Sequence, residues 1–442
     1  MPKVQSPKTM KDLRKISCTS DFSKLFERFL KKWILEDISA KLDPAQYGNQ
    51  KGTGTDHLLV ALVDRILKHL DQNLNTPAVI TTMLDWSAAF DRQCPTIGIK
   101  KFLEMGVRPS IVQVLTSYLS NRSMSVKFNG NTSRVHHMPG GGPQGTLLGV
   151  LEYLVQCNNN ADCVDETLRF KYVDDLTFLE LISLSTLSHG LSSYNVKNHV
   201  PCDIGVDHLF IPTESLCTQT YINSISQWTD QNLMLLNADK SNYMLITRAV
   251  GDYSTRLQLN NNNLDRVKSV KLLGIWLTDT LDWELNTMEI CKKAYARISL
   301  LSKLKYVGMK MEDLLTVYKT FIRCIVEYCC VVWHSSLTVH QNNALERIQR
   351  ICLKIILGKD YVDYISALET CELETLESRR GKLSLSFAKK AIKSSKHRHL
   401  FPAAVHQHDH QLRQQEQYHV NHARTEKYRK SAIPYIQRLL NQ

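Results

Sequence analysis

A pair of adjacent carboxylates, Asp174 and Asp175, constrains this chain more than any other feature. The pair lies between two short runs of aromatic and β-branched residues, 170–173 and 176–178, which is the pattern of a β-hairpin with the acids at its turn. Adjacent like charges repel each other, so such a pair is costly unless a cation lies against it. A solvated turn is the ordinary explanation of an Asp-Asp dipeptide alone, and the segments upstream therefore decide between the two.

Two upstream segments belong with this pair. Residues 78–91 read as a buried β-strand that delivers Asp85 at its end and then turns into a helix. Residues 139–149 form a Gly-rich loop that leads into an apolar helix. The chain therefore presents an acid at a strand end, a Gly-rich loop and an acid pair on a hairpin, in that order.

This order resembles motifs A, B and C of nucleic-acid polymerases. The resemblance implies that Asp85 and Asp174 hold two Mg²⁺ ions roughly 3.5–4 Å apart, with Asp175 close by as a third ligand. Such a pair of ions stabilises both the attacking 3′ oxygen and the leaving pyrophosphate in phosphoryl transfer. Carboxylates suit Mg²⁺ because it is a hard, octahedral cation that favours oxygen ligands, and Mn²⁺ is the expected substitute.

Further segments resemble the reverse transcriptase of non-LTR, LINE-type retrotransposons, particularly the jockey-like group. These segments are residues 12–17 (DLRKIS), 46–57, 228–240 (motif D), 270–275 (the motif E primer grip) and 316–333 (the thumb). The resemblance implies an α+β right-hand polymerase with fingers, a ferredoxin-like palm and a helical thumb. It implies RNA-templated DNA synthesis, in which a primer 3′-OH attacks a dNTP as part of a retrotransposon.

The chain also departs from the family pattern. Lys15 stands where proline is usual, three glycines precede Pro143, and Gly149 is followed by Val150 where Gly-Pro is usual. These changes put the geometry of the dNTP site in doubt but remove none of the carboxylates. No endonuclease module precedes the fingers, so the chain is expected to be a fragment of a longer polyprotein or a truncated copy.

Phe90, five residues after Asp85, occupies the family's steric-gate position, where a bulky ring would clash with a ribose 2′-OH. An ordinary core phenylalanine is the alternative. Viral RNA polymerases also carry a second aspartate after motif A, as Asp91 does here, but the Phe90-Asp91 pair fits a reverse transcriptase better. DNA synthesis is therefore expected.

Four residues complete the expected substrate site. Arg14 is expected to reach the triphosphate, with a plain surface arginine as the alternative. Gln144 and Gly145 are expected beneath the incoming nucleotide, and a turn that satisfies local backbone is the alternative. Lys240 is the expected general acid for the leaving pyrophosphate, and a solvated lysine in a polar loop, residues 237–242, is the alternative.

The composition fits a polyanionic partner. The formal charge is +12, and residues 387–442 hold eleven Lys and Arg against three acidic residues. Phosphate neutralisation would supply most of the affinity for an RNA template and a DNA primer. For the basic segment itself, template RNA contact and a solvated charged tail remain equally open.

The chain shows neither a long apolar span nor a signal peptide, and its twelve cysteines have no disulfide spacing. No membrane partner is expected, and the location is expected to be intracellular, in the nucleus or the cytoplasm. Nothing in the sequence indicates an oligomeric state. Two other functions stay open: a catalytically silent remnant that only binds RNA, and an RNA-dependent RNA polymerase.

The resemblance, together with periodicity and composition, implies four regions. They are fingers at 1–76, a palm at 77–290 with a surface insertion at 181–217, a helical thumb at 291–386 and a basic C-terminal tail at 387–442. Helices are predicted at 22–37 and 56–70 in the fingers. Three more are predicted at 281–304, 311–333 and 341–357, which would build the thumb.

Overall fold

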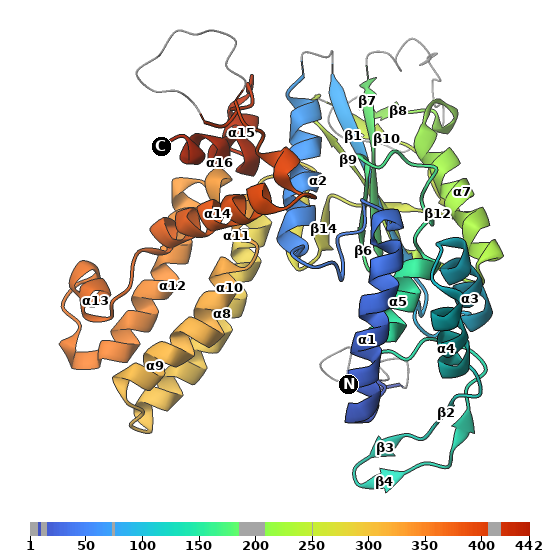
Figure 1. Cartoon of the computed structure of the whole chain (residues 1–442). Helices are drawn as coiled ribbons and strands as arrows, with labels where there is room; N and C mark the ends of the chain where they lie inside the picture. The colour runs from blue at the N-terminus through green and yellow to red at the C-terminus, as the bar shows by residue number, and fades with distance from the viewer. Residues whose placement is uncertain (1–7, 10–15, 73–75, 185–207, 250, 405–416) are drawn as a thin grey trace.

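The computed structural model describes residues 8–9, 16–72, 76–184, 208–249, 251–404 and 417–442. Arg14 and most of the predicted insertion lie outside these residues. Figure 1 shows a central sheet, a helical lobe built from α8 to α14 on one side, and helices α3, α4 and α7 on the other. The mixed helix and sheet content expected for the α+β class is confirmed.

The central sheet has the order β13-β9-β1-β7-β6. Its four long strands follow the chain as β1 (Pro77–Trp86), β6 (Arg169–Tyr172), β7 (Asp175–Ser183) and β9 (Leu236–Thr247), with helices between β1 and β6 and between β7 and β9. Numbered by chain order, these strands lie as 4-1-3-2, and neighbours are antiparallel. This is the βαββαβ arrangement of a ferredoxin-like fold, so the predicted palm is confirmed.

Strand β1 lies in the middle of the sheet and is buried on both faces, which explains its unbroken apolar sequence. Val79 and Met83 pack into a core shared with α2 (Thr55–Leu70) and the helical lobe. Ile80 and Leu84 point to the opposite face and pack with α7 (Cys217–Gln231). In the described residues, both faces of the sheet around β1 are therefore covered by packed side chains.

The second face also carries the helices that follow β1. A smaller core joins α1 to three of them, and their bounds are α1 (Asp21–Ile38), α3 (Pro95–Glu104), α4 (Pro109–Leu119) and α5 (Leu147–Gln156). One hairpin arm projects beyond α4 (Figure 1), in which β2 pairs with β5 at the base and β3 pairs with β4 at the tip. Its strands are β2 (Ser123–Met124), β3 (Lys127–Phe128), β4 (Asn131–Thr132) and β5 (His136–His137). The predicted helices at 22–37 and 56–70 are confirmed as α1 and α2.

Small strands follow β7 and β9. They are β8 (His208–Phe210), β10 (Asp252–Ser254), β11 (Gln258–Leu259), β12 (Asn262–Asn263), β13 (Asp265–Arg266), β14 (Ser269–Leu272) and β15 (Ile275–Thr278). The antiparallel pair β14–β15 contains the segment expected as the primer grip, with its turn at Leu273 and Gly274. The hydroxyl of Tyr328 donates to the carbonyl of Leu273 at 2.8 Å, so the helical lobe rests on this turn.

The helical lobe contains the three helical runs predicted for the thumb. Its helices are α8 (Glu284–Tyr306), α9 (Met311–Val317), α10 (Arg323–Glu327), α11 (Cys330–Trp333), α12 (Val339–Leu357), α13 (Tyr364–Thr370) and α14 (Leu376–Lys393). A π-helical segment, Tyr318–Ile322, joins α9 to α10. Cys329 has a positive φ of 48° and breaks the helical run before α11, so the middle run is not a single helix.

Two predicted boundaries are corrected. The expected limit between residues 386 and 387 falls inside α14, because Phe387, Ala388 and Ala391 are core residues of that helix. The expected insertion at 181–217 starts too early, because β7 continues to Ser183 and pairs with Pro77.

The region expected to be a basic tail is folded in its described parts. Helices α15 (Glu426–Arg429) and α16 (Ala432–Leu440) contribute Tyr428, Ile433 and Ile436 to the core that holds α2. Asp71, at the end of α2, accepts hydrogen bonds from the backbone N–H groups of Arg424 and Thr425 at 2.9 and 2.7 Å. The solvated-tail alternative is therefore wrong for residues 417–442.

In the described residues, none of the helices combines the length and the apolar character that crossing a membrane requires.

Candidate active site

The three predicted carboxylates belong to adjacent strands. Leu84 of β1 lies opposite Leu176 of β7, so Asp85 and Asp175, the next residues toward this end of the sheet, lie beside each other. Tyr172 pairs with Asp175, which leaves Val173 and Asp174 as the two-residue turn. The pKa of Asp175 is raised to about 6, mainly by burial and further by the charges of Asp174 and Asp85. The predicted hairpin and the meeting of its acids with motif A are thus present in the fold.

A β-bulge in β9 lies next to Asp85, because residues 238–241 of β9 lie between the pairs Met83–Asn242 and Asp85–Asn237. The pairing of β1 with β9 shifts register between Met83 and Asp85, and the Asp85 N–H donates to the hydroxyl of Ser241 at 3.1 Å. A bulge commonly turns one side chain out of the regular alternation, often next to an active site. One carboxylate oxygen of Asp85, Oδ2, is buried and has no hydrogen-bond partner.

Lys240 lies across from this oxygen. Its ammonium nitrogen is 3.6 Å from Asp85 Oδ2, which is an ion-pair distance. The residue lies within the bounds of β9, in the bulge at residues 238–241, so the alternative of a loop at 237–242 is corrected to a strand with a bulge, although the lysine side chain is 70% exposed. Lys240 and the neighbouring Ser241 both contact Asp85, so this polar half of β9 contributes to the site.

The carboxylates suit a divalent cation chemically. Asp85 Oδ2 is a buried acceptor that lacks a hydrogen bond, and the pKa of Asp175 is raised by burial and then by the charges of Asp174 and Asp85. A hard cation would relieve both conditions, because it supplies positive charge to oxygen ligands. Among the described residues, no group of three or more His, Cys, Asp or Glu side chains is already gathered as a metal-ligand set.

Residues 46–48 hold the turn from outside the sheet. The side-chain oxygen of Gln46 accepts hydrogen bonds from the N–H groups of Gly48 and Val173 at 2.8 and 3.0 Å. A Cβ on Gly48 would lie 2.5 Å from the Val173 nitrogen, so glycine permits this close approach. Gln46 and Gly48 belong to a segment that resembles the family, but the resemblance predicted no contact between them and the turn.

The Gly-rich loop is held by the residues that follow β1. Gly141 N–H donates to the carbonyl of Gln93 at 2.8 Å, and Gly142 N–H donates to that of Phe90 at 2.7 Å. The side chain of Gln93 in turn donates to the carbonyl of Gly149 at 3.3 Å. Arg122 donates to the carbonyl of Gly141 from the other side. Sequence reasoning missed Gln93 and Arg122, because neither lies in a motif.

The expected helix directly after Asp85 is not formed. Residues 87–92 are turns, with Ala88 at a positive φ of 52°, and α3 begins only at Pro95. Phe90 therefore lies on a turn above α5, where its partly buried ring stacks on Tyr153 with centroids 5.0 Å apart. This position faces the Gly-rich loop, which keeps the steric-gate prediction open.

Gln144 and Gly145 lie where the loop approaches α5. The carbonyl of Gln144 accepts the N–H of Ser17 at 2.7 Å, and Gly145 has a φ of 103°, which favours glycine. Thr146 then caps α5, its side chain accepting the N–H of Gly149 at 3.0 Å. The backbone of this loop thus joins the segment after Arg14 to α5, while Arg14 itself is outside the described residues.

A buried acid lies behind the loop. Glu152 of α5 is 1% exposed, and neither carboxylate oxygen has a hydrogen-bond partner. Burial raises the pKa of Glu152 to about 7, although the charge of Arg122 opposes this shift. This acid was not identified from the sequence, where the apolar run around it simply predicts a helix.

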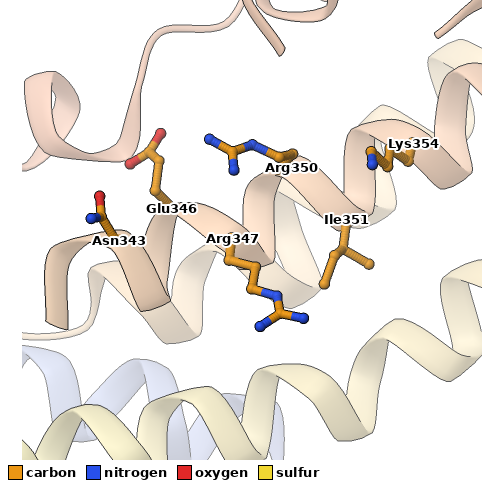
Figure 2. A pocket seen from close by; sticks show the side chains of 6 residues that line it. All are labelled: Asn343, Glu346, Arg347, Arg350, Ile351 and Lys354. Atoms are coloured by element: carbon orange, nitrogen blue, oxygen red, sulfur yellow. The ribbon is translucent and has the colours of Figure 1, made fainter. Parts of the chain in front are cut away.

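A separate hollow of about 600 Å³ lies on the outer thumb helix α12, away from the carboxylates. Figure 2 shows that its lining side chains project from one helix; they are Asn343, Glu346, Arg347, Arg350, Ile351 and Lys354. The guanidinium carbon of Arg350 lies 4.9 Å from the centre of the Tyr364 ring, a cation–π contact. Three cations on one exposed surface indicate affinity for anions rather than a second catalytic centre.

Comparison with known families identifies the class of polymerase to which this chain belongs. Residues 2–277 match the family described as reverse transcriptase (RNA-dependent DNA polymerase). This chain belongs to the reverse transcriptase family. The predicted family is therefore confirmed, and the RNA polymerase alternative loses its support.

Two curated relatives are transposon proteins of flies. The chain is 24% identical to a probable RNA-directed DNA polymerase from transposon BS of Drosophila melanogaster, over 76% of this chain and 36% of that protein. It is 23% identical to the RNA-directed DNA polymerase from mobile element jockey of Drosophila funebris, over 84% of this chain and 38% of that protein. This reverse transcriptase chain thus spans little more than a third of their length.

Among solved structures, apo telomerase from Candida tropicalis matches with 12% identity and a TM-score of 0.39. The match covers 84% of this chain and 54% of that one. Membership of the reverse transcriptase family follows from the match over residues 2–277.

Proposed function

We propose that the chain catalyses RNA-templated DNA synthesis, joining a dNTP to a primer 3′-OH within a retrotransposon protein. The observation that carries the proposal is the meeting of Asp85 on β1 with the Asp174-Asp175 turn at one end of a ferredoxin-like palm. Family membership fixes the class of reaction, and these three carboxylates supply its charge.

The proposed roles follow from the chemistry of each side chain. Asp85, Asp174 and Asp175 would hold two Mg²⁺ ions, which when bound activate the 3′ oxygen and neutralise charge on the pyrophosphate. Lys240 would give a proton to the leaving pyrophosphate, a role supported by the position of its ammonium group beside Asp85. Phe90 is the proposed barrier to a ribose 2′-OH.

The proposed partners are an RNA template, a DNA primer and dNTPs. The overall charge of +12 favours polyanions, and the cations of the α12 hollow offer one surface for phosphate. Arg350 is held against Tyr364 and so is partly pre-positioned for such a contact. Exchanging Arg347 and Lys354 for glutamine should weaken duplex binding and reduce its salt dependence.

The deciding experiment compares the parent with Asp174→Asn. Primer extension on an RNA template, with dNTPs and NTPs in separate reactions, should show DNA synthesis by the parent and none by the variant. An amide cannot neutralise a divalent cation, whereas the basic surfaces would still bind RNA. Equal extension by both proteins would overturn the metal assignment. RNA binding without extension by either protein would favour the silent remnant, and extension with NTPs alone an RNA polymerase.

A further inference from the structure

The outer edge of β6 is covered by residues from the fingers region. Tyr47 N–H donates to the carbonyl of Lys171 at 2.7 Å, and Lys171 N–H donates to the carbonyl of Ala45 at 2.9 Å. Buried Asp43 anchors this segment, with one carboxylate oxygen 2.5 Å from the Lys171 ammonium and the other 3.1 Å from Arg169. Because β6 is an edge strand of the sheet, this segment fixes the hairpin that carries the acid pair.

The turn of that hairpin is strained. Val173 has a φ of 60°, which is unfavourable for a β-branched residue and persists only where surrounding contacts hold it. Its N–H donates to the side-chain oxygen of Gln46, a residue only 6% exposed. Val173 directly precedes Asp174, so the amide oxygen of Gln46 stabilises the backbone conformation that presents both acids.

A lysine about 350 residues later holds Gln46 in place. The Lys396 ammonium donates to the backbone carbonyl of Gln46 at 2.6 Å and to the side chain of Gln50 at 2.7 Å. It also lies 5.1 Å from the centre of the Tyr47 ring. The next residue, His397, is 1% exposed and hydrogen-bonds through Nε2 to the Thr53 hydroxyl at 2.9 Å.

We propose that Gln46 and Lys396 are positioning residues for the catalytic hairpin. Lys396 fixes the segment that contains Gln46, and Gln46 fixes the turn that presents Asp174 and Asp175. The segment around residue 396 then belongs to the scaffold of the active site and is not a nucleic-acid tail. This inference rests on the proposed function, because it assigns the hairpin a catalytic role.

Four variants test whether the contacts from Lys396 to Gln46 and from Gln46 to the turn position the acids. Gln46→Leu removes the oxygen that accepts the Val173 N–H, whereas Gln46→Glu keeps an oxygen there. Lys396→Met removes the ammonium group, and Lys393→Met removes an exposed lysine of α14 as the matched control. In primer extension, kcat should fall about 10- to 100-fold for Gln46→Leu and Lys396→Met, because small misplacements of reacting groups are costly.

The readouts separate positioning from a loss of stability. The KM for dNTP and the affinity for template–primer should stay within about twofold, Gln46→Glu should recover most of the rate, and Lys393→Met should match the parent. The double variant Gln46→Leu/Lys396→Met should be little worse than the poorer single variant, because both residues act through one segment. Additive losses, or rates that follow only the melting temperature, would overturn the proposal.

A binding measurement keeps the test independent of turnover. Electron paramagnetic resonance of free Mn²⁺ should report an affinity several-fold weaker in Gln46→Leu than in the parent, and an unchanged affinity in Lys393→Met. If Gln46→Leu does not fold, Lys396→Met gives the same comparison. If the parent binds Mn²⁺ but does not extend primers, the proposed function alone is wrong. If the folded variants bind Mn²⁺ as tightly as the parent, the positioning role is wrong. If the parent neither binds Mn²⁺ nor extends primers, both the proposed function and the positioning role are wrong.

Discussion

The ammonium nitrogen of Lys240 lies 3.6 Å from Asp85 Oδ2, across the pairing of β9 with β1. The lysine side chain is 70% exposed, so this ion pair adds little to folding stability. Its geometry nevertheless places a proton donor beside the carboxylate that is expected to bind metal. The proposed general-acid role of Lys240 is therefore open to a direct kinetic test.

Lys240→Met should lower kcat for primer extension about 100-fold, because general-acid assistance commonly contributes 10²- to 10⁴-fold. Affinity for template–primer should change little, since one exposed cation is lost. Steady-state kinetics with a filter-binding assay measure both effects. Lys268→Met, at an exposed position just after β13, is the matched control. A Lys240→Met variant with parental kcat would exclude the general-acid role.

Phe90→Ala should admit ribonucleotides into the product while incorporation of deoxynucleotides falls modestly. Removing the ring opens space beside C2′, and the carboxylates of β1 and β7 stay in place. The ring also stacks on Tyr153, so the variant is expected to lose about 1–3 kcal/mol of stability, less than a fully buried phenylalanine. Extension assays with matched dNTP and NTP concentrations, alongside a thermal melt, test this. A folded variant that still rejects ribonucleotides would exclude the gate.

Glu152→Gln should stabilise the protein at pH 8 but not at pH 5. Burial raises the folded-state pKa of Glu152 to about 7, so the folded state holds a proton that the unfolded chain releases near its ordinary pKa of 4.5. Stability from this group is therefore lost as pH rises from about 4.5 to 7, by at most about 3 kcal/mol.

Calorimetric melts of the Glu152 variant at both pH values measure that effect. The unpaired amide that replaces the carboxylate offsets part of the gain. Glu104→Gln, at an exposed position of α3, provides the control and should show no pH-dependent difference. A Glu152→Gln variant that is equally destabilised at pH 5 and pH 8 would contradict the buried, protonated state.

Ending the chain at residue 386 should abolish cooperative folding rather than simply weaken RNA binding. The truncation removes Ile433 and Ile436 from the core around α2, and these two side chains alone contribute roughly 3–6 kcal/mol. That is a large part of the 5–15 kcal/mol typical of a whole protein. Lys389→Gln/Lys390→Gln, two exposed changes on α14, should instead leave the melting temperature unchanged. A truncated chain with a parental melt would contradict this packing.

Local patterns in the sequence predicted the elements that build the site. Alternation around Asp174 gave the hairpin, the apolar run before Asp85 gave the central strand, and 3.6-residue periodicity gave α1 and α2. Each depends on side chains close together in sequence. The turns at 87–92 escaped detection, because the left-handed φ of Ala88 carries no glycine or asparagine signal.

Contacts between distant segments could not be read in this way. The polar start of β9 looks like a loop from its composition, and its contacts with Asp85, through Lys240 and Ser241, involve a distant strand. Lys396 and Gln46 are about 350 residues apart, and nothing near either residue indicates the other. The amphipathic pattern of residues 432–440 could have predicted helix α16. The basic residues around it instead favoured the interpretation of this region as a charged tail.

The docking of residues 424–440 on α2 has a consequence for the order of folding. Helix α2 leaves the ribosome about 350 residues before the segment that covers it and that hydrogen-bonds to Asp71. At 5–20 residues per second, the apolar face of α2 waits roughly 20–70 s for this cover during synthesis. Within this chain, the packing of α2 is therefore completed only after residues 424–440 have been made, and until then its apolar face has only the palm residues of the same core to cover it.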